Sequence, residues 1–97
     1  EPTEALGYDN LEAEIDGLTL YPNPADNELN VRFNVLSDEA SKITITDVAG
    51  KEVKVSKIMA ITGSNLVMLD TDAFAPGMYF LNLEIGTANQ TLQFVIK

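Results

Sequence analysis

The stretch LNVRFNV, residues 29–35, alternates apolar and polar side chains without a break. Strict alternation is typical of a β-strand with one buried face, because successive side chains of a strand point to opposite sides. The same pattern recurs in short runs along the chain, at the spacing usual for all-β domains. Its other apolar members are Leu18 and Leu20, Ile43 and Ile45, Val53 and Val55, Val67 and Leu69, Tyr79 to Ile85, and Leu92 to Ile96. We therefore predict an all-β fold, a seven-stranded antiparallel Ig-like β-sandwich.

The sharpest interruption is the YPNP segment, residues 21–24, which stands between two of these runs. Proline has no N–H to donate to a β-ladder, so the first strand is expected to stop at Tyr21. Asn23 and Pro24 are favoured first and second residues of a type I turn. We therefore expect a sharp corner here, running through Ala25 and Asp26.

Two further turns are predicted from their residue types. In DVAGK, residues 47–51, Asp47 suits the start of a type I turn and Gly50 the left-handed position after it, as in a hairpin with a glycine bulge. In APGM, residues 75–78, Pro76 and Gly77 suit the central positions of a type II turn.

Composition argues against several classes of function. The chain has 97 residues, enough for one packed domain, and contains no cysteine, histidine or tryptophan. Disulfides and thiolate zinc sites are therefore excluded, and the commonest general base at neutral pH is missing. The net charge of −9 makes nucleic acid an unsuitable partner, because phosphate binding requires clustered lysine and arginine. No run is long enough to predict a membrane-spanning helix.

Residues 1–17 differ from the rest, with six acidic residues, no basic residue and no strand period. We interpret them as an acidic flexible linker that precedes a folded unit at residues 18–97. The chain also begins without a methionine, and we expect it to be a piece of a longer protein.

Without histidine or cysteine, an enzyme would need paired carboxylates. The candidate pairs are Asp70 and Asp72, Asp26 and Glu28, and Asp38 and Glu39. All of them fall at predicted turns or strand ends, where such side chains bond the local backbone, so we predict no catalytic site and no cofactor. Oxygens of DTD (70–72) or YDN (8–10) offer a weak calcium alternative, and NQT (89–91) matches the glycosylation sequon with low specificity.

Four features occur in a fixed order: LYPNPADNELNV (20–31), ITITDVAGKEV (43–53), LDTDAFAPGMYFLNLEIG (69–86) and TLQFVIK (91–97). Together they resemble the C-terminal sorting domain of proteins exported by the type IX secretion system of Bacteroidetes-type bacteria. The resemblance covers residues 18–97. It marks a set of recognition residues, namely Tyr21, Pro22, Asn23, Pro24, Asp47, Gly50, Lys51, Gly77, Tyr79, Phe94, Ile96 and Lys97.

The resemblance implies a non-catalytic secretion signal that follows a larger cargo domain. The cargo would pass through the periplasm and the outer membrane to the cell surface or the medium. The implied partners are the outer-membrane translocon and shuttle proteins of the type IX system. A sortase-like surface peptidase would then remove the domain by cleavage within residues 1–17.

Two questions stay open on the sequence alone. The alternative function is an accessory Ig-like binding or adhesion module of a cell-surface protein, for carbohydrate or protein, using exposed rings among Tyr8, Tyr21, Phe74 and Phe80. The export machinery either contacts the YPNP segment directly or needs only the fold that it enforces. The closing strand, with no segment after it, is expected to offer its edge to a partner strand or to a second copy.

Overall fold

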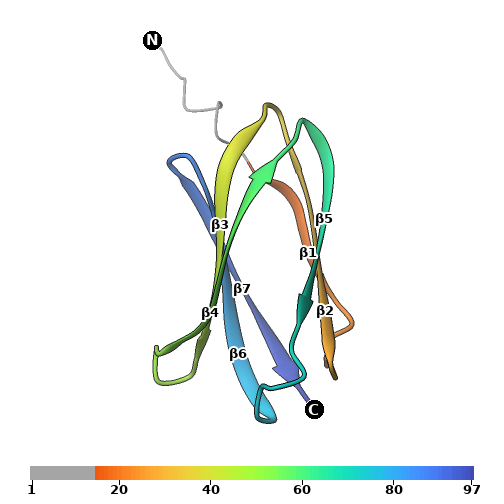
Figure 1. The fold of residues 1–97 in the computed structure, drawn as a ribbon, viewed down its shortest axis with the longest axis vertical. Helices are drawn as coiled ribbons and strands as arrows, with labels where there is room; N and C mark the ends of the chain where they lie inside the picture. Colours follow the sequence, from red (N-terminus) through yellow and green to blue (C-terminus); the bar gives the residue numbers. More distant parts are fainter. Residues whose placement is uncertain (1–14) are drawn as a thin grey trace.

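The computed structural model describes residues 15–97. Its seven strands are β1 (Asp16–Tyr21), β2 (Glu28–Val35), β3 (Glu39–Asp47), β4 (Glu52–Ala60), β5 (Gly63–Asp70), β6 (Gly77–Ile85) and β7 (Ala88–Ile96). They form a three-stranded sheet with the order β1-β2-β5 and a four-stranded sheet with the order β4-β3-β6-β7. Every strand pair is antiparallel, and the two sheets face one another (Figure 1).

This arrangement confirms the predicted all-β antiparallel sandwich and each of the seven expected strands. The Ig-like part stays a prediction. In constant-type immunoglobulin domains the fourth strand joins the sheet of the first, second and fifth. Here β4 pairs with β3 in the other sheet.

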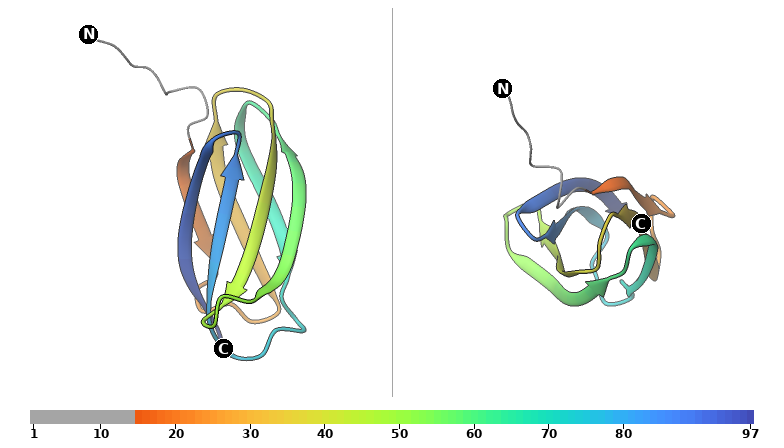
Figure 2. Two further views of the ribbon diagram at one scale, coloured as in Figure 1. Left: turned by 90° about the vertical axis from the view of Figure 1, so that its left-hand side faces the viewer. Right: turned by 90° about the horizontal axis from the view of Figure 1, so that it is seen from above.

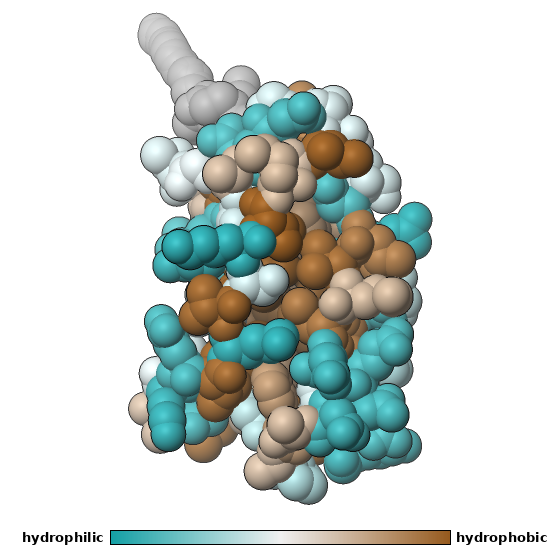
Figure 3. All heavy atoms as spheres, viewed as in Figure 1, coloured by the Kyte–Doolittle hydropathy of each residue, from teal (hydrophilic) through white to brown (hydrophobic). Residues whose placement is uncertain are grey.

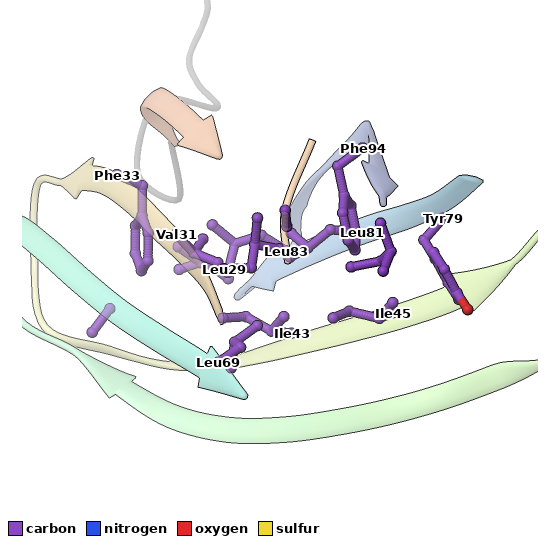
Figure 4. Packing of buried hydrophobic residues seen from close by; sticks show 14 of the residues in the cluster. Leu29, Val31, Phe33, Ile43, Ile45, Leu69, Tyr79, Leu81, Leu83 and Phe94 are labelled. Carbon is purple, nitrogen blue, oxygen red and sulfur yellow. The ribbon is translucent and has the colours of Figure 1, made fainter. Parts of the chain in front are cut away.

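The core lies between the sheets and is supplied by one face of each central strand. Leu29, Val31 and Phe33 of β2 are fully buried, as are Leu81 and Leu83 of β6. Figure 4 shows these side chains, with Ile43, Ile45 and Phe94, pointing toward one another from the two layers. The period-2 alternation that defined these strands in the sequence therefore also identifies their buried side.

The prediction was wrong for one strand, β4, whose inward face we assigned to Val53 and Val55. These two side chains are 39% and 47% exposed. Ala60 is fully buried and Ile58 packs against the core, so the alternation places Lys54 and Ser56 on the inner side. A register irregularity between Ile45 and Thr46 of β3 accompanies this strand pair. Apolar residues occupy both faces of β4, and alternation alone cannot tell which face is inside.

Because the strands alternate in direction, the connections fall into two groups at opposite ends of the sandwich (Figures 1 and 2). The chain enters at Ile15 at one end, which also carries the β2–β3, β4–β5 and β6–β7 connections. The other end carries the β1–β2, β3–β4 and β5–β6 connections together with Lys97. We call this second end the C-terminal end.

At the end where the chain enters, one carboxylate joins two loops that are far apart in the sequence. Asp38 Oδ1 accepts hydrogen bonds from the Thr62 backbone N–H at 2.7 Å and the Thr62 hydroxyl at 2.9 Å. The backbone bond first, and the hydroxyl second, lower the pKa of Asp38 below its ordinary value of 3.8. Any stabilisation from this ionised group is present above its unfolded pKa and is lost as the pH falls through its lowered folded pKa.

Replacing Leu29 by alanine should cost about 2–5 kcal/mol of unfolding free energy, because it leaves a cavity between the sheets. The matched control is Leu66→Ala on the neighbouring strand β5, where the side chain is 56% exposed. That change should stay within about 0.5 kcal/mol of the wild type. Urea unfolding of both variants measures the difference, and equal losses would contradict the assignment of the core.

Carboxyl NMR titration of the native domain should give Asp38 a pKa below its ordinary value. The Thr62→Val variant loses the hydroxyl donor and keeps the backbone donor. Its Asp38 pKa should rise toward, and stay below, the ordinary value. A wild-type Asp38 that titrates at or above its ordinary pKa would rule out the loop–loop hydrogen bonds.

Candidate recognition surface at the C-terminal end of the sandwich

All twelve residues singled out in the sequence lie at or near the C-terminal end, although they are spread over 77 positions from Tyr21 to Lys97. Tyr21 ends β1, Asp47 ends β3, and Gly77 begins β6. The register of the four-stranded sheet then pairs Asp47 with Tyr79, and Tyr79 with Phe94. The structure thus gathers the predicted residues, some exposed and some buried, at one end of the sandwich, which we call the motif end.

The YPNP segment is hydrogen-bonded to the last strand. Asn23 Oδ1 accepts from the Val95 N–H at 3.1 Å. Ala25 N–H donates to the Val95 carbonyl at 2.7 Å, and Lys97 N–H donates to the Ala25 carbonyl at 2.9 Å. Ala25 is fully buried and forms an isolated parallel bridge with Ile96. The segment therefore joins the three-stranded sheet to the edge of the four-stranded one.

This contact corrects two predictions. In place of the expected type I turn at residues 23–26, the chain bends at residues 22–24, and Ala25 bonds to β7 through both its N–H and its carbonyl. The closing strand was expected to offer its edge to a partner because no segment follows it. Its end at Val95 to Lys97 is instead covered by a segment that comes before it in the chain, whereas pairing along the rest of its edge stays a prediction.

The DVAGK turn matches its prediction. Asp47 Oδ1 accepts from the backbone N–H groups of Ala49 at 2.9 Å and Lys51 at 3.0 Å. Gly50 N–H donates to the Asp47 carbonyl at 3.0 Å, and Gly50 has a φ of 87°. That conformation favours glycine. Lack of room is not the reason for glycine here, because a Cβ at this position would meet no atom within 4 Å. Asp47 thus shapes the turn, and the Lys51 side chain is exposed beside it.

Three aromatic rings pack below the surface of the motif end. The Tyr79 ring lies 5.3 Å from Phe74 and 5.8 Å from Phe94, centroid to centroid, and its hydroxyl donates to the Ala75 carbonyl at 2.6 Å. Tyr79 and Phe94 are therefore structural members of the core.

The type II turn predicted in APGM, residues 75–78, was wrong. Gly77 has a φ of 148°, whereas the third residue of a type II turn requires a φ of about 80°.

The structure also reveals a residue at this end that sequence reasoning missed. Thr71 is fully buried, and its N–H donates to the Asn27 carbonyl at 3.1 Å. Its hydroxyl donates to the Asp26 carbonyl at 3.4 Å. Thr71 thus ties the β5–β6 connection to the β1–β2 connection. The sequence signal was the threonine inside LDTD, which we interpreted only through its two flanking aspartates.

The acidic pairs considered for catalysis or calcium are brought partly together. Glu28 pairs with Asp70 across β2 and β5, and both line a hollow of about 470 Å³ with Asp72. Asp70 Oδ1 accepts from the Asp72 N–H at 2.9 Å, a local turn contact of the expected kind. Within residues 15–97, no three acidic side chains lie close enough to hold a metal ion. The YDN alternative lies outside the described residues.

The remaining candidates are also placed. In the sequon, the Asn89 Oδ1 and Thr91 Oγ1 atoms both accept from Asn82 Nδ2, at 3.4 and 2.8 Å. Of the rings considered for a binding module, Tyr21 is exposed, Phe74 packs against the core, and Phe80 is half-buried. Tyr8 lies outside the described residues. The described rings thus provide one exposed aromatic side chain.

Comparison with known proteins gives two kinds of result. The family model described as a secretion system C-terminal sorting domain matches residues 19–97. Comparison with curated proteins gives no match. Solved structures similar to the chain include a β-glucosidase from Erythrobacter marinus, with a TM-score of 0.54, 10% identity, and coverage of 87% of this chain and 15% of the enzyme. A β-glucosidase from Listeria innocua in complex with glucose gives a TM-score of 0.49 and 15% identity, with coverage of 99% and 18%.

The chain spans less than a fifth of either enzyme, and at these identities the structural likeness to the Erythrobacter enzyme shows the fold alone. The family match covers most of the chain. The chain therefore belongs to the family of type IX secretion C-terminal sorting domains. This is a family of sorting signals rather than of enzymes, and its members direct proteins to the cell surface.

Replacing Asn23 by alanine should loosen the end of β7, because the Val95 N–H loses its acceptor. We expect faster hydrogen exchange at Val95 and a loss of about 0.5–1.5 kcal/mol of unfolding free energy. The control is Asn23→Asp, whose carboxylate can accept the same hydrogen bond and should preserve protection of Val95. Unchanged exchange at Val95 in the alanine variant would contradict the contact.

Proposed function

We propose that residues 18–97 form a sorting domain that carries a larger cargo protein, attached before residue 1, across the outer membrane by the type IX system. The main support is the gathering of the family's characteristic residues on the motif end. Exposed members separated by most of the chain, such as Tyr21, Lys51 and Lys97, lie together there, as a surface recognised by one partner requires. The translocon and shuttle proteins of the system are the partners that we assign to it.

The motif residues divide into two groups by exposure, and we propose a different role for each. Tyr79, Phe94 and Ile96 are buried and act through the fold. Lys51 and Lys97 are exposed and available for direct contact, as is the YPNP segment. Since Asn23 and Ala25 also bond to β7, we propose that the YPNP segment is needed chiefly for the fold.

Removal of the domain after export is assigned to a sortase-like surface peptidase that cuts within residues 1–17. The described chain enters the sandwich at Ile15, at the end away from the motif residues (Figure 1). This placement supports the proposal, because a peptidase could act there while the motif end is still bound. The division into a linker, residues 1–17, and a sorting domain stays part of the proposal, although β1 already takes up Asp16 and Gly17.

We propose a route through the periplasm to the cell surface or the medium. In residues 15–97 there is no helix of the length and apolar character needed to cross a membrane. The alternative adhesion module has less support, because an exposed cluster of rings was its distinguishing feature. Among the described candidates, only Tyr21 is exposed.

Fusing residues 1–97 to a periplasmic reporter, in a host with the type IX system, should deliver the reporter to the cell surface. Deleting residues 95–97 should trap it in the periplasm, because the bonds to the YPNP segment are lost. Protease accessibility of the reporter on intact cells measures delivery. A reporter that stays in the periplasm with the intact domain would end the export proposal.

The Asn23→Asp variant separates a role in the fold from direct recognition. It keeps the acceptor for Val95, so export at the wild-type level is expected if the YPNP segment acts through the fold. The Lys51→Ala variant, which leaves the backbone bonds of its turn intact, tests direct contact, and Lys57→Ala on β4 is its matched control. Lost export in a stably folded Asn23→Asp domain would contradict our assignment.

A further inference from the structure

The two edge strands β4 and β5 carry an exposed apolar surface outside the motif end. It is formed by β4, β5 and their connection, and we call it the β4–β5 face. Its members are Val53, Val55, Met59, Ile61, Leu66 and Met68, which are 39–66% exposed. Figure 3 shows apolar side chains gathered in the middle of this side of the molecule, with hydrophilic ones around them. Such grouping on one side of a small domain marks an interaction surface.

The sandwich has two seams where the sheets meet, and they differ. At the seam between β1 and β7, Ala25 bridges to Ile96 and closes the gap with backbone bonds. At the seam between β4 and β5, within the described residues, neither strand pairs with a strand of the other sheet. Ile58 and Val67, which pack against the core from these strands, stay partly exposed there. Ile58 and Val67 therefore extend the apolar surface into the open seam, toward the core.

Charges of opposite sign flank the apolar surface. On the β4 side, Lys51 and Lys57 are exposed, and Lys54 is half-buried on the inner side of the strand, at the open seam. These are three of the six basic residues of the chain, and Glu52 is the only acid among them. On the β5 side, Glu28, Asp70 and Asp72 line the acidic hollow, whose wall includes Met68 of the face. A wholly acidic or wholly basic partner would match only one of these flanks.

The two flanks lie at the same level of the face. The strands run in opposite directions from the Ile61–Thr62 link. Lys54 lies seven residues before Ile61, and Asp70 lies eight residues after Thr62. A twofold axis in the plane of the face and parallel to the strands would therefore set the basic flank of one copy against the acidic flank of the other. The face is self-complementary in both charge and apolar character.

We propose that the β4–β5 face is a self-association surface whose occupant is a second copy of this chain, packed about such a twofold axis. The apolar side chains form the centre of the interface. The lysines of β4 sit against the carboxylates at the end of β5 of the other copy. This inference does not rest on the proposed export function, because it concerns the isolated chain, although Lys51 belongs to both surfaces. It also differs from pairing along β7, which uses another edge.

The test uses sedimentation equilibrium of residues 1–97 over a concentration series, with two charge variants. One carries Lys51→Glu and Lys54→Glu, and the other carries Asp70→Lys and Asp72→Lys. Each variant places like charges across the interface, so each alone should self-associate at least about tenfold more weakly than the wild type. Mixed together, the two variants restore opposite charges at every contact. The mixture should therefore regain dimers.

The design separates specific contacts from net charge. Two Lys→Glu changes take the chain from −9 to −13, and two Asp→Lys changes take it to −5. General repulsion alone would make the −5 variant associate more strongly than the wild type, whereas the proposal expects weaker association. A Leu66→Ser variant should also weaken the dimer about tenfold or more, and Met78→Ser, an exposed residue of β6, which β3 separates from β4, should not.

Three outcomes would overturn the proposal. The wild-type chain could stay monomeric up to millimolar concentration. The mixture could fail to restore association while each variant keeps its native circular dichroism spectrum. Dimers could also persist unchanged in the Leu66→Ser and charge variants, which would assign self-association to another edge such as β7. A chain that stays monomeric and uses this face to bind a component of the export apparatus would overturn the proposal in the same way as the first outcome.

Discussion

The contact between the YPNP segment and β7 is the constraint on which the rest of the structure depends. Among the described residues, the backbone hydrogen bonds that link the two sheets directly are those of Ala25 with Val95 and Lys97. The Asn23 side chain adds a third bond to the same strand end. Because Ala25 and Ile96 are both buried, this bridge fixes how the sheets close over the core and which seam stays open.

The sequence predicted the parts of the fold that depend on local chemistry. Alternation in LNVRFNV identified β2 and its buried side, and Asp47 with Gly50 identified the β3–β4 hairpin. It failed for β4, where Val53 and Val55 alternate as well as any core pair. The deciding residues are Ile58 and Ala60, several positions away, which set the inner face of the whole strand. Strands with apolar residues on both faces do not reveal which face the core will take.

The candidate site was predicted as a set of residues and not as a surface. Resemblance to the family supplied their identities, but nothing in the chain indicated that Asn23 and Val95 would meet. Their separation is 72 residues, and the bond depends on the placement of both sheets. Thr71 and Ala25 were missed for the same reason, since each owes its role to a partner on a distant segment. Local patterns predict turns and strands, whereas contacts between distant loops require the assembled sandwich.

The bridge from Asn23 and Ala25 to β7 also fixes the order in which this domain can be completed. When the chain emerges from a ribosome or a pore in the N-to-C direction, the YPNP segment appears long before Val95, its partner 72 residues later. The seam between β1 and β7 therefore stays open until β7 has been added. Contacts of such long sequence separation also slow folding, because the loop entropy is lost before the contact forms. The bridge can therefore form only in a complete domain, because a chain that ends before Val95 lacks the partner of the YPNP segment.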